Sequence, residues 1–263
     1  MTVLRLADAG EAADLAAFLA RLIHYDRAAV VRLQAGGGVL AVFGRPPSFE
    51  VLAIRTVRLA GDHTLDTTVS AGELLDGIDE PVATLTVPAG VTGPPWTGVL
   101  PPRGGWQRLP GLPAPEALVR AVAAAVAEFR ARAEALPPQH RTRAERDRIG
   151  REIWSRSLGD THLPLRAAHA AQSLGFLRPA RTGALAGGRT ANGTEAPSSQ
   201  VPGSQARSSQ TPGSQVPGTR PQQLSLLSAA GWLRLSTPYG SIAVRTGDPA
   251  GLTGLSGLTV TPV

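Results

Sequence analysis

The chain of 263 residues contains no cysteine and no lysine, and only 4% of its residues are aromatic. Without cysteine there are no disulfide bonds, thiolate metal sites or cysteine nucleophiles. The absence of lysine has two explanations: selection for planar recognition of phosphate or carboxylate by arginine, or the codon usage of a GC-rich genome. The arginines are scattered over the chain rather than gathered at one motif, which favours codon usage.

Long apolar runs are also missing, and the first residues lack the charged start and apolar core of a secretory signal. We therefore expect a cytoplasmic protein with no membrane partner.

Charge is divided unevenly along the chain. Residues 1–114 hold nine arginines and eleven acidic residues, whereas residues 115–263 hold seventeen arginines and nine acidic residues. A basic second half of this kind suggests an anionic partner for that half.

Residues 1–87 are predicted to form an α+β domain. Asp8 stands three residues before Glu11, the spacing of a helix-capping box, and the predicted helix that follows carries an apolar face of Leu15, Phe18, Leu19 and Leu22. Segments rich in Val, Ile and Leu predict strands at 2–6, 29–33, 39–43, 51–59, 63–69 and 82–87, with a short helix at 71–75.

Residues 88–114 are rich in proline, glycine and tryptophan and are predicted to be an irregular crossover with neither helix nor strand. The next region, 115–180, predicts three helices. The first begins at Pro115, with apolar residues at three- and four-residue steps up to Leu136, and the others span about 142–157 and 164–174.

The remaining residues divide into three parts. Residues 181–223 contain a near-repeat of Ser-Gln and Pro-Gly pairs and lack aromatic side chains, which predicts a disordered linker. Residues 224–250 predict a β-hairpin that returns to the helical region, and residues 251–263 predict a loose tail. The expected fold class is thus α+β: a helix on a small antiparallel sheet, then three helices and a hairpin.

Two tryptophans in the crossover, Trp96 and Trp106, are candidates for an aromatic wall against a ligand, a peptide or an unstacked base. The alternative is that these large side chains only anchor the crossover to the core.

The second predicted helix is rich in arginine. The order of three helices, a Gly-Phe-Leu-Arg strand at 175–178 and a Gly-Trp-Leu-Arg strand at 231–234 is that of a winged-helix module. This order makes the helix at 164–174 a candidate for the major groove of DNA. The candidate nucleic-acid-binding residues are Arg141, Arg148, Arg151, Arg166, His169 and Gln172.

Motifs for catalysis, cofactors and metals are weak. Residues 183–190 have the spacing of a phosphate-binding loop, but Arg189 replaces the necessary lysine. The five histidines have no zinc-site spacing, and the acidic cluster of Asp76, Asp79 and Glu80 is typical of a solvated turn. The sequence therefore predicts no particular catalytic residue, cofactor site or metal site.

These observations favour a non-enzymatic accessory or regulatory protein that binds another macromolecule, most simply a protein. Two alternatives remain open. One is a DNA-binding regulator that uses the basic half, and the other is an enzyme whose catalytic groups are dispersed along the sequence.

Overall fold

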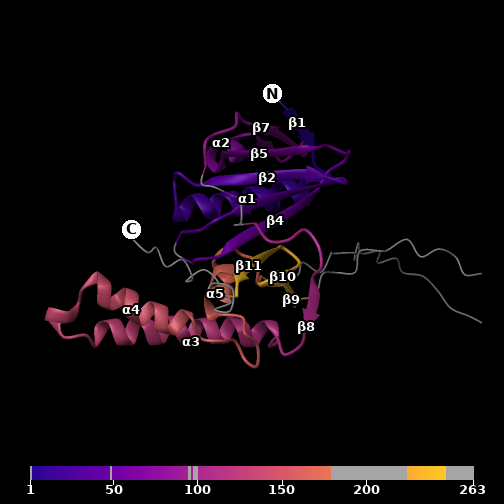
Figure 1. Cartoon of the computed structure of the whole chain (residues 1–263). Helices are drawn as coiled ribbons and strands as arrows, with labels where there is room; N and C mark the ends of the chain where they lie inside the picture. Colours follow the sequence, from indigo (N-terminus) through magenta and orange to yellow (C-terminus); the bar gives the residue numbers. More distant parts are fainter. Residues whose placement is uncertain (1, 48, 94–95, 97–99, 179–223, 247–263) are drawn as a thin grey trace, which may run out of the picture. The chain divides into compact units, whose positions relative to one another are not determined.

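The computed structural model describes residues 2–47, 49–93, 96, 100–178 and 224–246 (Figure 1). Helices pack against antiparallel sheets, which confirms the α+β class. The linker predicted at 181–223 and the tail predicted at 251–263 lie outside the described residues. None of the described helices combines the length and apolar character that a membrane span needs.

The first long helix begins where the sequence predicts it. The side chain of Asp8 accepts a hydrogen bond from the backbone N–H of Glu11 at 2.9 Å, and α1 (Ala9–Tyr25) follows. Its predicted apolar face is buried, including Phe18 and Leu19. α1 therefore packs as an amphipathic helix against the sheet beside it.

A small antiparallel sheet lies at one end of the N-terminal half. Its strand order is β1-β7-β6, from β1 (Thr2–Arg5), β7 (Thr84–Val87) and β6 (Ile78–Asp79), and α2 (Ala71–Asp76) packs against α1.

The main sheet has eight antiparallel strands in the order β5-β2-β3-β4-β11-β10-β9-β8. Its two middle strands come from opposite ends of the chain, because Leu52, Ala53 and Ile54 of β4 pair with residues 241–243 of β11. One sheet thus runs through both halves of the chain. The strand bounds are β2 (Val30–Gly36), β3 (Val39–Gly44), β4 (Leu52–Arg58), β5 (Leu65–Ser70), β8 (Gln107–Leu109), β9 (Ser225–Ala229), β10 (Trp232–Thr237) and β11 (Gly240–Arg245).

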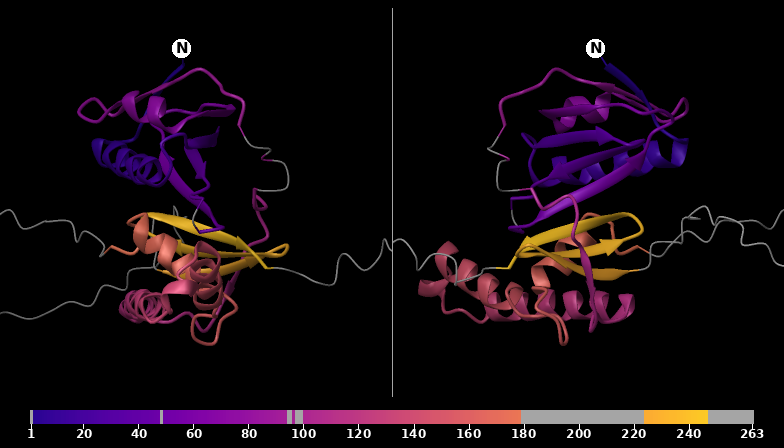
Figure 2. Two further views of the ribbon diagram at one scale, coloured as in Figure 1. Left: turned by 90° about the vertical axis from the view of Figure 1, so that its left-hand side faces the viewer. Right: turned by 45° about the vertical axis from the view of Figure 1, so that its right-hand side comes forward.

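Three helices follow the crossover: α3 (Pro115–Glu134), α4 (Arg143–Trp154) and α5 (Leu165–Ser173). α3 begins at Pro115, as predicted. α5 contacts β11, α3 and α4, so it lies between the sheet and the other two helices (Figure 2). A short 3₁₀ turn, η1 (Pro138–His140), joins α3 to α4.

The structure corrects the predictions in three places. The crossover contains a strand, β8, which pairs with β9, and β9 extends the predicted hairpin to three strands. Residues 175–178 form a turn rather than the strand of a winged-helix order. Gly175 has a φ of +75°, a left-handed conformation that ends α5 and lies outside the range of a regular strand.

The two faces of the main sheet bury different side chains, because successive residues of a strand point to opposite sides. One face belongs to the larger core with α1 and α5 and includes Val57, Leu235 and Ile242. The other face carries a smaller cluster of Phe43, Leu52, Ile54, Trp96, Trp232 and Ala243. Figure 2 shows the described part of the crossover passing on the side of the sheet opposite to α1.

Candidate functional site

A groove of about 840 Å³ lies where the N-terminal and C-terminal strands of the main sheet meet. It is bordered by the end of α1, the β3–β4 loop, the ends of β10 and β11, and Trp96 of the crossover. We call it the tryptophan groove. Its described lining is Asp26, Ala28, Ala29, Val30, Arg45, Pro46, Pro47, Glu50, Val51, Leu52, Trp96, Trp232, Ala243, Val244 and Arg245.

A tight turn places Trp232 at the groove. Ala230 and Gly231, with φ values of +42° and +75°, connect β9 to β10 as a two-residue hairpin turn. Trp232 then pairs with Arg245 across β10 and β11, and the Arg245 guanidinium carbon lies 5.1 Å from the centre of the indole ring. The pair forms a cation–π contact on the groove wall.

The two crossover tryptophans have different positions. Trp96 is 8% exposed, belongs to the smaller cluster and lines the groove. Its side chain therefore anchors the crossover to the sheet and also forms part of the groove wall. Its buried indole Nε1 has no hydrogen-bond acceptor in the described part of the chain. Trp106 donates through Nε1 to the Pro102 carbonyl at 3.1 Å and lies outside the described lining of the groove, with the Arg234 guanidinium 5.6 Å from its ring centre.

The chemistry of the described lining suits binding of apolar groups. Eleven of its fifteen residues are apolar, and the four charged ones, Asp26, Arg45, Glu50 and Arg245, balance in sign. Asp26 accepts a hydrogen bond from the Ala28 N–H at 2.9 Å. The described lining includes no serine, threonine, tyrosine or histidine, and so presents no hydroxyl or imidazole to a bound molecule.

Sequence reasoning missed Trp232, Arg245 and Arg45. A signal for the first was present: in Trp232-Leu-Arg-Leu, the alternation buries Leu233 and Leu235 in the larger core and places Trp232 on the opposite face. A large aromatic residue on that second face indicates that this face is also covered by other residues or takes part in binding. Arg45 has no comparable signal, since it lies in a loop whose position depends on the whole sheet.

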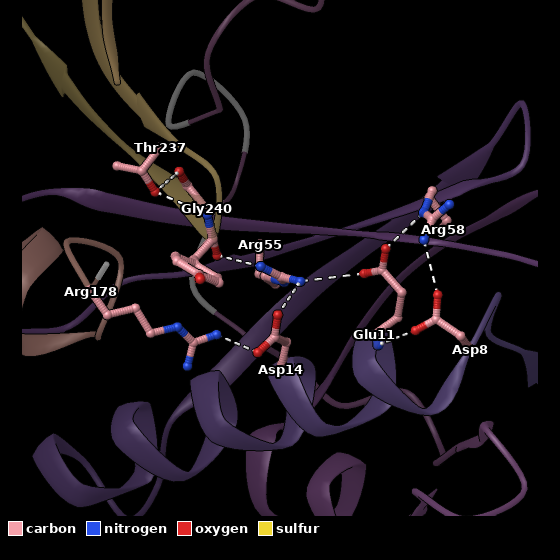
Figure 3. Close-up of polar contacts among 9 residues, drawn as sticks. Asp8, Glu11, Asp14, Arg55, Arg58, Arg178, Thr237 and Gly240 are labelled. Atoms are coloured by element: carbon pink, nitrogen blue, oxygen red, sulfur yellow. Dashed lines mark hydrogen bonds and ion pairs between the residues drawn. The ribbon is translucent and has the colours of Figure 1, made fainter. Parts of the chain in front are cut away.

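A network of ion pairs lies on the other face of the sheet and connects the two halves (Figure 3). The buried Arg55 of β4 contacts Glu11 at 3.3 Å and Asp14 at 3.2 Å on α1, and it donates a hydrogen bond to the Tyr239 carbonyl at 2.6 Å. Arg178 pairs with Asp14 and lies over the Tyr239 ring. Because an arginine neutralises each carboxylate, this network is a structural joint rather than an acid–base pair.

Two of the four arginines of α4, Arg143 and Arg148, form ion pairs with acidic residues of the same helix, and an acidic residue of α4 joins this helix to α3. Glu152 accepts hydrogen bonds from Arg132 of α3 at 2.7 and 2.8 Å, and this contact lowers the pKa of Glu152 to about 2. Among the predicted nucleic-acid residues, Arg148 pairs with Glu145 and Arg141 donates to the Leu136 and Glu134 carbonyls at the end of α3. Arg151 is exposed.

The predicted DNA-reading helix α5 is largely covered. Five of its nine residues are buried. Gln172 is exposed, whereas Arg166 is half-buried. His169 stacks on Trp154 with ring centres 4.2 Å apart and makes a T-shaped contact with Phe49 with ring centres 5.0 Å apart. Burial lowers the pKa of His169. This packing weighs against α5 as a recognition helix, and nucleic-acid binding by the six residues stays a prediction.

Asp76, Asp79 and Glu80 line a second hollow of about 620 Å³. Within the described ranges, no group of three or more acidic, histidine or cysteine residues is arranged to hold a metal ion.

Comparison with known families divides the chain within the crossover. A family model described as "Domain of unknown function (DUF8010)" matches residues 1–98, and another, "Domain of unknown function (DUF8185)", matches residues 101–249. No match was found among curated proteins or among solved structures. The second model matches more than half of the residues of the chain, so the chain belongs to the family described as Domain of unknown function (DUF8185).

Proposed function

We propose that this protein is a non-enzymatic accessory or regulatory protein that binds an extended apolar segment of a partner protein in the tryptophan groove. The observation that carries the proposal is the groove itself, a hollow with eleven apolar residues among its fifteen described lining residues and with Trp96 and Trp232 among them. Tryptophan and arginine are the residues that most often carry binding energy at protein interfaces.

The lining favours a protein segment over a small polar molecule. Small-molecule sites usually hold a few convergent polar groups that fix the orientation of the ligand. Here the described polar groups are four charged side chains with balanced signs, and the carboxylate of Asp26 already accepts a backbone N–H. Such a surface suits aliphatic side chains.

Selection from a random peptide library displayed on phage, followed by calorimetry of the enriched peptides, tests this proposal. We expect micromolar peptides rich in aliphatic residues. Truncation of Trp232 to alanine should weaken their binding about 30-fold, the effect of a hot-spot loss of about 2 kcal/mol. Val82→Ala is the matched control, because Val82 is 60% exposed and lies outside the described lining.

A second variant guards against misfolding of the Trp232→Ala protein, whose indole is part of the smaller cluster. Pro47→Arg adds a large charged side chain at an exposed position of the lining and leaves the buried residues unchanged. It should also weaken peptide binding, while its circular dichroism spectrum stays that of the parent. Peptides that bind both variants as tightly as the parent, or a library that yields no binder, would contradict the proposal.

A further inference from the structure

The last strand of the described chain ends in the wall of the tryptophan groove. Val244 and Arg245 of β11 both line the groove, and Thr246 directly follows them. The residues after Thr246 therefore start beside Trp232, the strand partner of Arg245. Any ligand supplied by these residues has a very short tether.

The sequence after Thr246 contains a three-residue repeat. Residues 251–259 read Gly-Leu-Thr, Gly-Leu-Ser, Gly-Leu-Thr, so leucine recurs at 252, 255 and 258. Asp248 is the one charged residue among residues 247–263. A chain with three residues per turn, such as polyproline II, places leucines at this spacing along one side.

The tether is long enough to reach the groove. Five residues lie between Thr246 and Leu252, and the six Cα-to-Cα steps between these two residues span about 20 Å in an extended chain. A linker this short gives an effective concentration in the millimolar range, so even weak contacts keep a tethered ligand bound. The repeat also matches the groove chemically, since its side chains are aliphatic or small and uncharged.

We propose that residues 251–259 are an internal ligand of the tryptophan groove. Leu252, Leu255 and Leu258 pack against Trp96 and Trp232, and a partner segment binds by displacing them. This inference rests on the proposed function and adds its regulation: the protein competes with its own partner for one groove.

The test uses the full chain labelled with 5-fluorotryptophan, whose four ¹⁹F resonances are assigned with single Trp→Phe variants. The test variant carries Leu252→Ser, Leu255→Ser and Leu258→Ser. We expect the resonances of Trp96 and Trp232 to move and that of Trp154, which stacks on His169, to stay. Adding a synthetic peptide of residues 247–263 to this variant should return both resonances to their original positions.

The matched control keeps the leucines and changes their neighbours, with Thr253→Ala, Ser256→Ala and Thr259→Ala. It should leave all four resonances unchanged. Unchanged Trp96 and Trp232 resonances in the triple serine variant would overturn the inference.

Peptide affinities separate this inference from the proposed function. Library peptides are selected on the triple serine variant as well as on the parent. If both proposals hold, the selected peptides bind the serine variant about tenfold more tightly than the parent. Equal affinity with unchanged resonances overturns the internal ligand and supports the proposed function. Shifted resonances without any bound library peptide support the internal ligand and contradict the proposed function.

Discussion

His169 is a half-buried histidine in contact with aromatic side chains from two other parts of the chain. It stacks on Trp154 of α4 and makes a T-shaped contact with Phe49, which lies before β4. Burial lowers its pKa, so the neutral imidazole is the form that fits the folded protein. Protonation therefore opposes folding at this residue.

The consequence is a loss of stability in mild acid. An unfolded histidine has a pKa near 6.5, so below about pH 6.5 the unfolded chain binds a proton that the folded chain does not. We expect the urea midpoint to be constant above pH 7 and to fall between pH 6.5 and 5. The phenylalanine variant, His169→Phe, keeps the ring contacts and should flatten this dependence, whereas the exposed control His162→Gln should keep it. Identical pH profiles for His169→Phe and the parent would show that another group titrates.

At the scale of elements, Arg55 is the contact that holds α1, β4 and the β10–β11 turn together. Its side chain is 7% exposed and bonds to Glu11, Asp14 and the Tyr239 carbonyl. Removing one partner of a buried ion pair leaves charges without compensation in a poorly solvated place. The network is thus expected to matter for stability although ion pairs on the surface rarely do.

We expect Arg55→Ala to lower the free energy of unfolding by about 3 kcal/mol, measured by urea denaturation. The matched control is Arg143→Ala. Arg143 forms an ion pair with Asp147 while its side chain is 95% exposed, and its loss should cost less than about 0.5 kcal/mol. If Arg55→Ala lowered the free energy of unfolding by less than about 1 kcal/mol, packing of the larger core alone would hold α1, β4 and the β10–β11 turn together.

The sequence predicts the elements that depend on local signals. The capping of α1 by Asp8 and the start of α3 at Pro115 are both confirmed, because caps and helical periodicity act over a few residues. β8 escapes such reasoning because its three residues lie among prolines and glycines and gain their structure from pairing with β9. The groove also escapes reasoning from local signals. Trp96 was a candidate for a ligand-binding wall, but the position of Trp232 in the same cluster depends on the pairing of β4 with β11.

For the whole molecule, the family boundary and the sheet do not coincide. The matched regions end at residue 98 and begin at residue 101, whereas the main sheet continues through both. Separate fragments 1–100 and 101–263 would each expose the strand edge that β4 and β11 cover in the intact protein. The two family regions therefore share one folded unit.

We expect neither fragment alone to show a cooperative thermal transition, and we expect the two fragments to copurify when they are produced together. Circular dichroism melting and gel filtration measure both outcomes. If fragment 1–100 melted cooperatively at the temperature of the intact protein, the β4–β11 pairing would be an accessory contact.

The pairing of β4 with β11 also sets an order in time. Arg55 and Tyr239 are 184 positions apart in the sequence, so β4 leaves the ribosome long before its neighbour exists. At typical synthesis rates of roughly 5–20 residues per second, this interval is about 10 to 40 s. During it, the nascent chain presents an open strand edge beside an incomplete core. Synthesis of this protein therefore includes a period in which the ribosome-bound chain is open to pairing with a wrong strand, and slowing translation after residue 58 prolongs that period.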